Sequence, residues 1–403
     1  MITFKDVAAA RARIRSQIYL SPCAYSETIS RMTGSRVLFK LENLQMTGSF
    51  KERGALNRLL TMDRGEAERG VVAASAGNHG MAVAFHSRRL GIPSTIVMPV
   101  HAPLIKATWV QRYGAKTVLH GADYDAAFEE AQRISNEEGL TLIHSFDDPW
   151  VTAGQGTLGI ELHEQNPDLD AVIVPVGGGG LIGGVALALK ELNPRIRVIG
   201  VQAEQLAAMK AALDKGEVVQ LPAATTIADG ISVRAVGETP FRLAQKYVDE
   251  IVTVNEGEIA NAVLLLLEIE KTVAEGAAAV PLAALVNRKV LLDGKKAALL
   301  VSGGNIDVNL ISRIIEKGLI QDGRLTQLSV TLADQPGSLA RLTERLAKER
   351  ANILQIQHVR GFGEIGIRET QVELVLETTG RDHIRRIHEA LSAEGFRIVA
   401  RPS

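Results

Sequence analysis

The chain has 403 residues, of which 46% are apolar and 4% aromatic, so it can bury at least one large core. Its formal net charge of −1 gives no reason to expect a nucleic-acid partner or binding to an acidic membrane. No apolar run approaches the roughly 18 residues of a membrane span. The N-terminal segment has no secretory hydrophobic region. Cys23 is the only cysteine, so we expect a cytoplasmic protein without disulfides.

Short apolar runs alternate with longer helical patterns along most of the chain. Most runs lack in-and-out alternation, which is typical of parallel strands covered by helices on both faces. Strands are expected at 37–41, 71–74, 95–98, 117–119, 141–144, 172–176, 198–202, 251–254 and 299–302. Helices are expected at 52–60, 81–90, 124–138, 181–192, 256–272 and 308–315. This alternation predicts an α/β protein whose parallel sheets form two lobes with a cleft between them.

The pattern changes beyond residue 315. We expect one helix to end at 316–318 and a turn at 321–323. The remaining elements are expected as a strand, a helix, two strands, a helix and a strand, at 328–332, 338–348, 353–359, 369–376, 382–391 and 396–400. This βαββαβ order is the ferredoxin-like unit. The sequence therefore predicts a long domain at 1–318, a linker at 319–324 and a small domain at 325–403.

Four successive glycines, Gly177–Gly180, follow one expected strand and precede a helix. Without Cβ atoms, their backbone N–H groups can converge on a phosphate at the positive end of the helix dipole. Gly178, Gly180 and Gly183 also satisfy G-x-G-x-x-G, with Glu204 at the spacing of a dinucleotide-binding fingerprint. The run therefore predicts a phosphate site and leaves open whether the ligand is a dinucleotide.

Further candidate residues lie where expected strands and helices meet. Lys51 opens a helix, where the positive dipole end lowers the pKa of an amine and favours a nucleophile, although a solvated surface lysine is the simpler reading. The loop 75–80 follows a strand, where open α/β sheets bind ligands. Ser302 ends the last strand of the long domain, where it can face a ligand or cap the next helix. For Glu275, the sequence favours the role of an acidic residue in the first turn of a helix.

In this order, the motifs resemble those of the threonine/serine dehydratases of pyridoxal-phosphate fold type II. The resemblance covers roughly residues 5–318 and rests on five motifs. They are Ser49-Phe50-Lys51-Glu52-Arg53-Gly54-Ala55, Ser75-Ala76-Gly77-Asn78-His79, Gly177–Gly180, Thr226-Ile227-Ala228-Asp229-Gly230 and Ser302-Gly303-Gly304-Asn305. The expected fold is therefore the two-lobed, tryptophan synthase β-like catalytic domain.

The resemblance implies pyridoxal 5′-phosphate as the cofactor. Lys51 would carry it covalently and then act as the base at the substrate Cα, while Phe50 would line its ring. Asn78 would donate to the ring oxygen, and Ser302 would face the ring nitrogen. The phosphate would be held by Gly177, Gly178, Gly179 and Gly180.

The resemblance also implies the reaction. The substrate carboxylate would bind the loop formed by Ser75, Ala76, Gly77, Asn78 and His79. Loss of the β-hydroxyl and the amine from L-threonine would give 2-oxobutanoate and ammonia, with L-serine as a further substrate. Serine racemisation and hydroxyaspartate dehydration are alternatives within the family, and an NAD-dependent oxidoreductase is the alternative outside it.

Some positions depart from the family pattern. Ala76 stands where racemising members have a second serine, which counts against racemisation. Met81 replaces a frequent glutamine, which removes no proposed catalytic step. The neighbourhood of Glu204 lacks the further acids of a divalent-cation site, and Lys210 lies close by in sequence. We therefore assign no metal ligand and leave open whether a cation binds near Glu204.

The C-terminal segment resembles an ACT domain. Asp334, Pro336, Gly337 and Leu339 match its first strand–helix turn, and Asn352-Ile353 opens its second strand. The resemblance makes an amino-acid effector possible at this domain and leaves open whether it is isoleucine, valine or none. It also implies a homo-oligomer, because such domains usually pair across chains.

Overall fold

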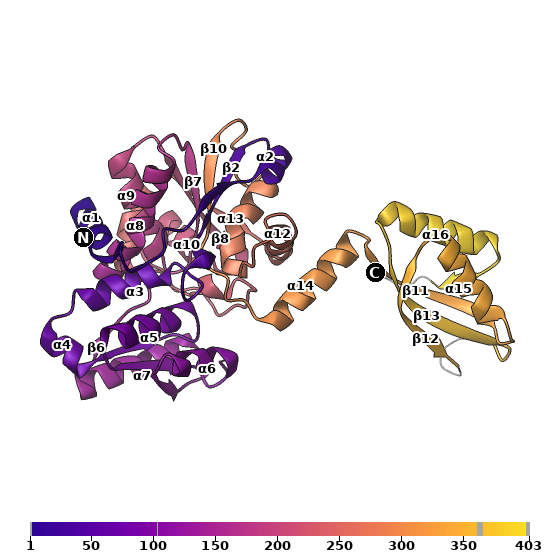
Figure 1. The fold of residues 1–403 in the computed structure, drawn as a ribbon, viewed down its shortest axis with the longest axis horizontal. Helices are drawn as coiled ribbons and strands as arrows, with labels where there is room; N and C mark the ends of the chain where they lie inside the picture. The colour runs from indigo at the N-terminus through magenta and orange to yellow at the C-terminus, as the bar shows by residue number, and fades with distance from the viewer. Residues whose placement is uncertain (1, 103, 361–365, 400–403) are drawn as a thin grey trace. The chain divides into compact units, whose positions relative to one another are not determined.

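The computed structural model describes residues 2–102, 104–360 and 366–399. The chain divides into two compact units, Met1–Ile306 and Asp307–Ser403. Figure 1 shows both units and labels many of their helices and strands. None of the helices within the described ranges combines the length and apolarity that a membrane span requires.

A six-stranded sheet forms the centre of the larger lobe of the first unit. Its strand order is β1-β2-β10-β7-β8-β9, and only the pairing of β1 with β2 is antiparallel. The strands are β1 (Cys23–Tyr25), β2 (Arg36–Leu41), β7 (Ala171–Pro175), β8 (Arg197–Ala203), β9 (Glu250–Val254) and β10 (Lys296–Val301). Their apolar side chains are buried on both faces of the central strands, as parallel strands between helices require.

A four-stranded parallel sheet forms the smaller lobe, in the order β5-β4-β3-β6. Its strands are β3 (Val71–Ala74), β4 (Ser94–Met98), β5 (Lys116–Leu119) and β6 (Thr141–Leu142). Helix α7 packs against β3 and β4, and α5 packs between this sheet and α3. In the larger lobe, α9 contacts β7 and packs against α8, while α13 contacts β7, β8, β9 and β10.

The α-helices of the first unit are α1 (Phe4–Ile14), α2 (Glu27–Thr33), α3 (Lys51–Leu60), α4 (Arg64–Arg69), α5 (Asn78–Leu90), α6 (Leu104–Arg112), α7 (Tyr124–Glu138), α8 (Pro149–Gln165), α9 (Gly180–Leu192), α10 (Ala208–Lys215), α11 (Glu238–Tyr247), α12 (Glu256–Glu268) and α13 (Gly276–Val286). Three short 3₁₀ helices lie at Glu42–Leu44, Glu204–Leu206 and Asp229–Ile231.

Local sequence signals set several helix boundaries. The Asp123 side chain accepts the Ala126 N–H at the start of α7, and Gly139 ends that helix in the left-handed conformation. Asp148 caps α8, with Pro149 as its first residue. The caps at Asp123 and Gly139 explain why the expected helix at 124–138 is confirmed without change.

The second unit is an antiparallel four-stranded sheet with helices, in the sheet order β12-β13-β11-β14. Its elements in chain order are α14 (Val308–Gln321), β11 (Leu325–Ala333), α15 (Ser338–Lys348), β12 (Asn352–Val359), β13 (Glu369–Glu377), α16 (Arg381–Ala393) and β14 (Arg397–Val399). The expected βαββαβ order is therefore present. Apolar side chains from β11, β13, α15 and α16 form its own buried core.

Most expected strands and helices are confirmed, with small shifts at their ends. The helix expected at 256–272 is shorter, because α12 ends at Glu268. The helix expected to end at 316–318 continues to Gln321, since Gly318 lies inside α14 and the positive-φ glycine comes only at Gly323. The expected strand at 396–400 reaches residue 400, which lies outside the described residues. Strand β1 was not anticipated.

Candidate active site

A cavity of about 340 Å³ lies in the first unit, where loops from both lobes meet. Its walls come from residues that follow strand ends: the loop after β3, the residues after β6, the glycines after β7 and Ser302 after β10. The carboxyl ends of parallel strands are where open α/β sheets bind ligands. The lining also includes Phe50 and Lys51, at the start of α3.

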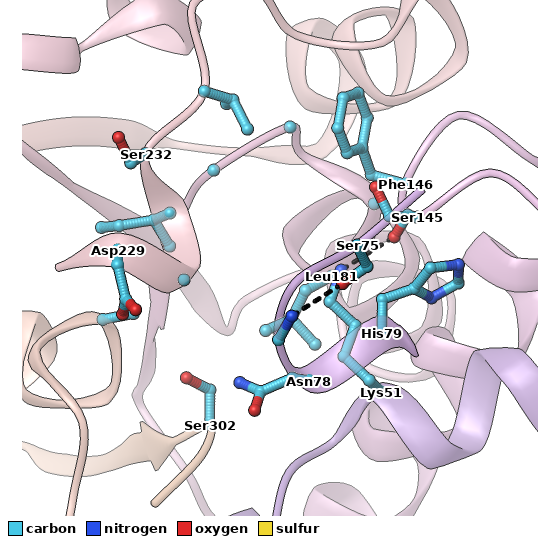
Figure 2. Close-up of a pocket in the computed structure, with 18 of the residues that line it drawn as sticks. Lys51, Ser75, Asn78, His79, Ser145, Phe146, Leu181, Asp229, Ser232 and Ser302 are labelled. Atoms are coloured by element: carbon cyan, nitrogen blue, oxygen red, sulfur yellow. Dashed lines mark hydrogen bonds between the residues drawn. The ribbon is translucent and has the colours of Figure 1, made fainter. Parts of the chain in front are cut away.

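Lys51 is held at this cavity by pairing between two distant segments. The Phe50 N–H donates to the Ser302 carbonyl oxygen over 3.0 Å, and Ser49 forms an isolated β-bridge with Gly303. The Lys51 Nζ donates to the Ser145 carbonyl oxygen at 2.8 Å (Figure 2). The same Nζ lies 5.3 Å from the centre of the Phe50 ring. The structure therefore brings Phe50, Lys51 and Ser302 together, as expected from sequence.

The Lys51 amine is a strongly perturbed base. Burial lowers its pKa from 10.5 to about 8, and the Glu275 carboxylate partly opposes this shift by stabilising the ammonium. A lysine with this pKa has an appreciable neutral fraction near neutral pH, which a surface lysine lacks. The amine can therefore act as a nucleophile or as a base.

A buried charge cluster fixes helix α3 just beyond Lys51. The Arg53 guanidinium, with no exposed surface, binds the Glu42 carboxylate at 2.7 and 2.8 Å and the Glu161 carboxylate at 2.8 Å on both terminal nitrogens. Lys40 also donates to Glu161, at 2.9 Å. Two cations and two anions thus compensate one another in a region without solvent. The cluster joins α3 and α8 and limits where the Lys51 backbone can move.

The glycine run, Gly177–Gly180, forms part of the cavity wall. Gly179 has φ +94°, a left-handed conformation that disfavours a side chain, and α9 begins at Gly180. A Cβ on Gly178 would lie 2.2 Å from the Phe146 ring. The absence of Cβ atoms therefore leaves backbone N–H groups accessible at a helix N-terminus, which suits a phosphate group.

The loop after β3 places the start of α5 at the cavity. Ser75, Ala76, Gly77, Asn78 and His79 all line it. The Gly77 N–H donates to the Ser75 hydroxyl at 3.1 Å, and the first N–H groups of α5 point out of the helix end without intrahelical partners. These donors can bind a carboxylate.

His79 has a structural position within that loop. Its Nε2–H donates to the Ile143 carbonyl oxygen at 2.9 Å, and its ring points away from the Lys51 amine (Figure 2). Burial is the main cause that lowers its pKa to about 3, so the imidazole stays neutral at physiological pH. His79 therefore anchors the start of α5 to the end of β6.

Asn78 and Ser302 lie on the same side of the cavity (Figure 2). The Asn78 Nδ2 donates to both oxygens of Glu275, at 2.8 and 3.0 Å. Glu275 is only 3% exposed and lines the cavity. Sequence reasoning favoured a helix-start role for Glu275, and it does precede α13 as the N-cap residue. Its contact with Asn78 was not anticipated.

For other lining residues the sequence predicted no role, although Asp229 belongs to the motif at 226–230. They include Tyr124, Ser145, Phe146, Asp229 and Ser232. Ser145 and Phe146 directly follow the expected strand at 141–144, so the strand-end rule that identified the other loops could have found them. No comparable local signal marks Tyr124 or Ser232. Within the described residues, no group of three or more His, Cys, Asp or Glu side chains could hold a metal ion.

Comparisons with known proteins agree with this geometry. The family model described as "Pyridoxal-phosphate dependent enzyme" matches residues 14–303. An L-threonine ammonia-lyase of Thermotoga maritima is 47% identical over 99% of both chains. The structure resembles the processed form of threonine deaminase isoform 2 from Solanum lycopersicum, with a TM-score of 0.74, 36% identity and coverage of 78% of this chain and 92% of that one. It also resembles serine racemase from Dictyostelium discoideum, with a TM-score of 0.72, 37% identity and coverage of 76% and 99%.

Proposed function

Because the chain belongs to the family of pyridoxal-phosphate dependent enzymes, we propose that it is a threonine ammonia-lyase of fold type II. It converts L-threonine into 2-oxobutanoate and ammonia, and the water lost from Cβ is regained when the nitrogen is released. L-Serine is a further substrate. The observation that carries this proposal is the Lys51 amine, with a pKa of about 8, in a cavity that Gly177–Gly180 also line.

The residues around the cavity fit the cofactor of the family. When bound, pyridoxal phosphate supplies an electron sink that acidifies the substrate Cα–H bond. Lys51 would hold its aldehyde carbon, Phe50 would line the ring, and Gly177–Gly180 would hold the phosphate. Asn78 would donate to the ring oxygen and Ser302 would face the ring nitrogen. The family match opposes the alternative of an NAD-dependent oxidoreductase, since the family is described by its dependence on pyridoxal phosphate.

The chain's own groups would then carry the proton transfers. The N–H groups at the start of α5 bind the substrate carboxylate and fix the orientation of Cα. The neutral Lys51 amine takes the Cα proton, since its lowered pKa gives it an appreciable unprotonated fraction near neutral pH and makes this form predominant above pH 8. The Ser302 hydroxyl is neutral, which favours loss of the β-hydroxyl over amino transfer.

Two measurements test this function together. Purified enzyme should release 2-oxobutanoate and ammonia in equal amounts from L-threonine. Borohydride reduction of the same preparation should attach the cofactor to the peptide that contains Lys51. A turnover-competent enzyme whose label maps to another lysine, such as the exposed Lys215, would contradict the assignment.

Racemisation is the second candidate, because a serine racemase is among the similar structures. Ala76 opposes it, since an alanine in the carboxylate loop offers no proton to the opposite face of Cα. We expect L-serine to yield pyruvate and ammonia without D-serine. Chiral chromatography of the products distinguishes the two outcomes.

We further propose that residues 1–318 form the catalytic domain, 319–324 the linker and 325–403 an ACT domain that regulates it. The second unit supports this with a cavity of about 320 Å³ at the turn between β11 and α15. Asp334, Ser338 and Arg360 line it and could bind the ammonium and carboxylate of an amino acid. We also propose a homo-oligomer, paired through this domain, in the cytoplasm.

An effector titration tests the regulatory proposal. Isoleucine or valine should change the KM or kcat for L-threonine in the full chain. Arg360→Met should weaken this response, whereas the exposed Arg385→Met, outside the cavity lining, should not. An unchanged response in Arg360→Met, or none in the parent, would contradict an effector site at this turn.

A further inference from the structure

The Asn78 amide is held at both ends by side chains from other segments of the first unit. Its Nδ2 donates to Glu275 Oε1 at 2.8 Å and to Oε2 at 3.0 Å. Its Oδ1 accepts from Asn305 Nδ2 at 2.6 Å. The same Asn305 nitrogen donates to the Thr47 carbonyl oxygen at 2.8 Å. A continuous hydrogen-bond chain therefore runs from Thr47 through Asn305 and Asn78 to Glu275.

The groups at both ends of this hydrogen-bond chain can only accept hydrogen bonds. A backbone carbonyl stands at one end and, in its ionised form, a carboxylate stands at the other. If the Asn78 amide were flipped, its oxygen would face the Glu275 carboxylate and its nitrogen would face the Asn305 nitrogen. Each contact would then be repulsive, and flipping Asn305 would place its oxygen against the Thr47 oxygen. The side-chain amides of Asn78 and Asn305 therefore have one favourable orientation each.

The Glu275 carboxylate is tightly enclosed, so it has little room to move away from the Asn78 amide. A Cβ on Gly303 would lie 2.6 Å from Glu275 Oε1, and one on Gly230 would lie 3.1 Å from it. The Glu275 N–H also donates to the Gly303 carbonyl oxygen at 3.1 Å, which ties the residue to the strand end that carries Ser302. The carboxylate therefore stays beside Asn78 and faces the cavity that Lys51 also lines.

We propose that Glu275 is a positioning residue which, with Asn305, fixes the Asn78 amide so that its remaining N–H donates to the ring oxygen of the cofactor. The inference rests on the proposed cofactor role of Asn78. Glu275 also acts at a distance on Lys51, because its negative charge stabilises the ammonium form. Glu275 and Asn305 therefore differ in one useful respect: both orient Asn78, but only Glu275 carries charge.

Cofactor affinity of the apoenzyme tests the orienting role without any turnover. Glu275→Gln and Asn305→Ala should each weaken pyridoxal-phosphate binding by about tenfold, the usual effect of a lost hydrogen bond near a charged group. Glu270→Gln is the matched control, because it removes a nearby carboxylate that binds Ser26 rather than Asn78. It should bind the cofactor as tightly as the parent.

A double-mutant cycle separates positioning from general damage. In an Asn78→Ala background, Asn305→Ala should no longer change cofactor affinity, because no amide remains to orient. The effect of Glu275→Gln should shrink there to the part that its charge exerts on Lys51. In the background that keeps Asn78, the pH midpoint for covalent attachment of the cofactor to Lys51 should fall in Glu275→Gln. It should stay unchanged in Asn305→Ala. A purely structural defect would not separate the two variants in this way.

The outcomes decide the proposal. Parent-like affinity in both variants, or an undiminished effect in the Asn78→Ala background, overturns it. Either result would leave the proposed reaction untouched, since turnover of L-threonine is measured separately. Conversely, an enzyme that binds the cofactor through Lys51 but ignores L-threonine would refute the proposed substrate and leave this inference standing.

Discussion

Two lysines of the first unit lie in opposite electrostatic surroundings. The Lys40 amine has no exposed surface and donates to Ser21 O at 2.9 Å, Glu161 Oε2 at 2.9 Å and Gln165 Oε1 at 3.0 Å. All three of its N–H donors are therefore matched, one of them by an anion. The Lys51 amine lies at a cavity, and its one hydrogen bond within the described residues goes to the neutral Ser145 carbonyl.

The difference between them is the distance to an anion. An ion pair in direct contact keeps a buried ammonium charged and makes it part of the scaffold. Glu275 stabilises the Lys51 ammonium only through a longer-range interaction and does not cancel the effect of burial, so the pKa remains near 8. Burial thus produces a structural cation in one place and a reactive amine in the other.

The largest expected effect is on turnover by Lys51→Met. Removing the group that both carries the cofactor and moves the Cα proton should lower kcat on the order of 10⁴-fold. The apoprotein should keep its fold and melt at a higher temperature at pH 7, because the variant no longer buries a desolvated ammonium. Steady-state kinetics and calorimetry of the apoprotein measure both effects.

A second result would break the comparison. If Lys51→Met lowers the Tm of the apoprotein instead of raising it, the amine is part of the scaffold. Its environment would then resemble that of Lys40.

Lys40→Met should show the reverse pattern. It leaves Glu161 with one partner fewer and leaves the Ser21 carbonyl and Gln165 without their buried donor. Breaking a buried ion pair typically lowers the free energy of unfolding by about 3 to 5 kcal/mol. Urea denaturation measures this loss. At temperatures where the variant is folded, kcat should change far less than in Lys51→Met, and a parent-like urea midpoint would contradict the structural role.

The pH dependence of amine reactivity sharpens the comparison further. With a pKa of about 8, Lys51 in the apoprotein is mostly neutral above that pH, and its reactivity falls tenfold for each pH unit below it. Competitive labelling with acetic anhydride, followed by peptide mass spectrometry, should give a midpoint about 2.5 pH units below that of exposed lysines. A midpoint shared with the surface lysines would show that burial does not perturb this amine.

The same lowered pKa predicts how apoprotein stability depends on pH. In the unfolded chain Lys51 keeps its ordinary pKa of 10.5, so between about 8 and 10.5 the unfolded state binds more protons than the folded state. Stability due to this group is therefore lowest below pH 8 and rises through that window. Methionine does not titrate, so the difference between the unfolding free energies of the parent and of Lys51→Met, measured across this pH window, isolates the contribution of Lys51.

Much of this arrangement could be predicted from sequence, because it depends on local signals. Continuous apolar runs and helical patterns located most strands and several of the helices, and the glycine run and Lys51 were identified at strand–helix junctions. The Arg53 cluster and the Asn78–Glu275 contact could not be predicted in this way. They join residues far apart in the chain, such as Asn78 and Glu275, whose meeting depends on how the lobes pack. Strand β1 was missed because three half-exposed residues carry no periodic pattern.

The smallest expected effect completes the comparison with a lysine on the surface. Lys215 pairs with Glu217 at 2.6 Å, a shorter contact than the one between Lys40 and Glu161, yet both side chains are more than 60% exposed. Water solvates these charges whether or not they pair, and salt screens their attraction. Lys215→Met should therefore leave both the Tm and kcat unchanged within error. A loss comparable to that of Lys40→Met would mean that contact distance, rather than burial, determines what a lysine contributes to this fold.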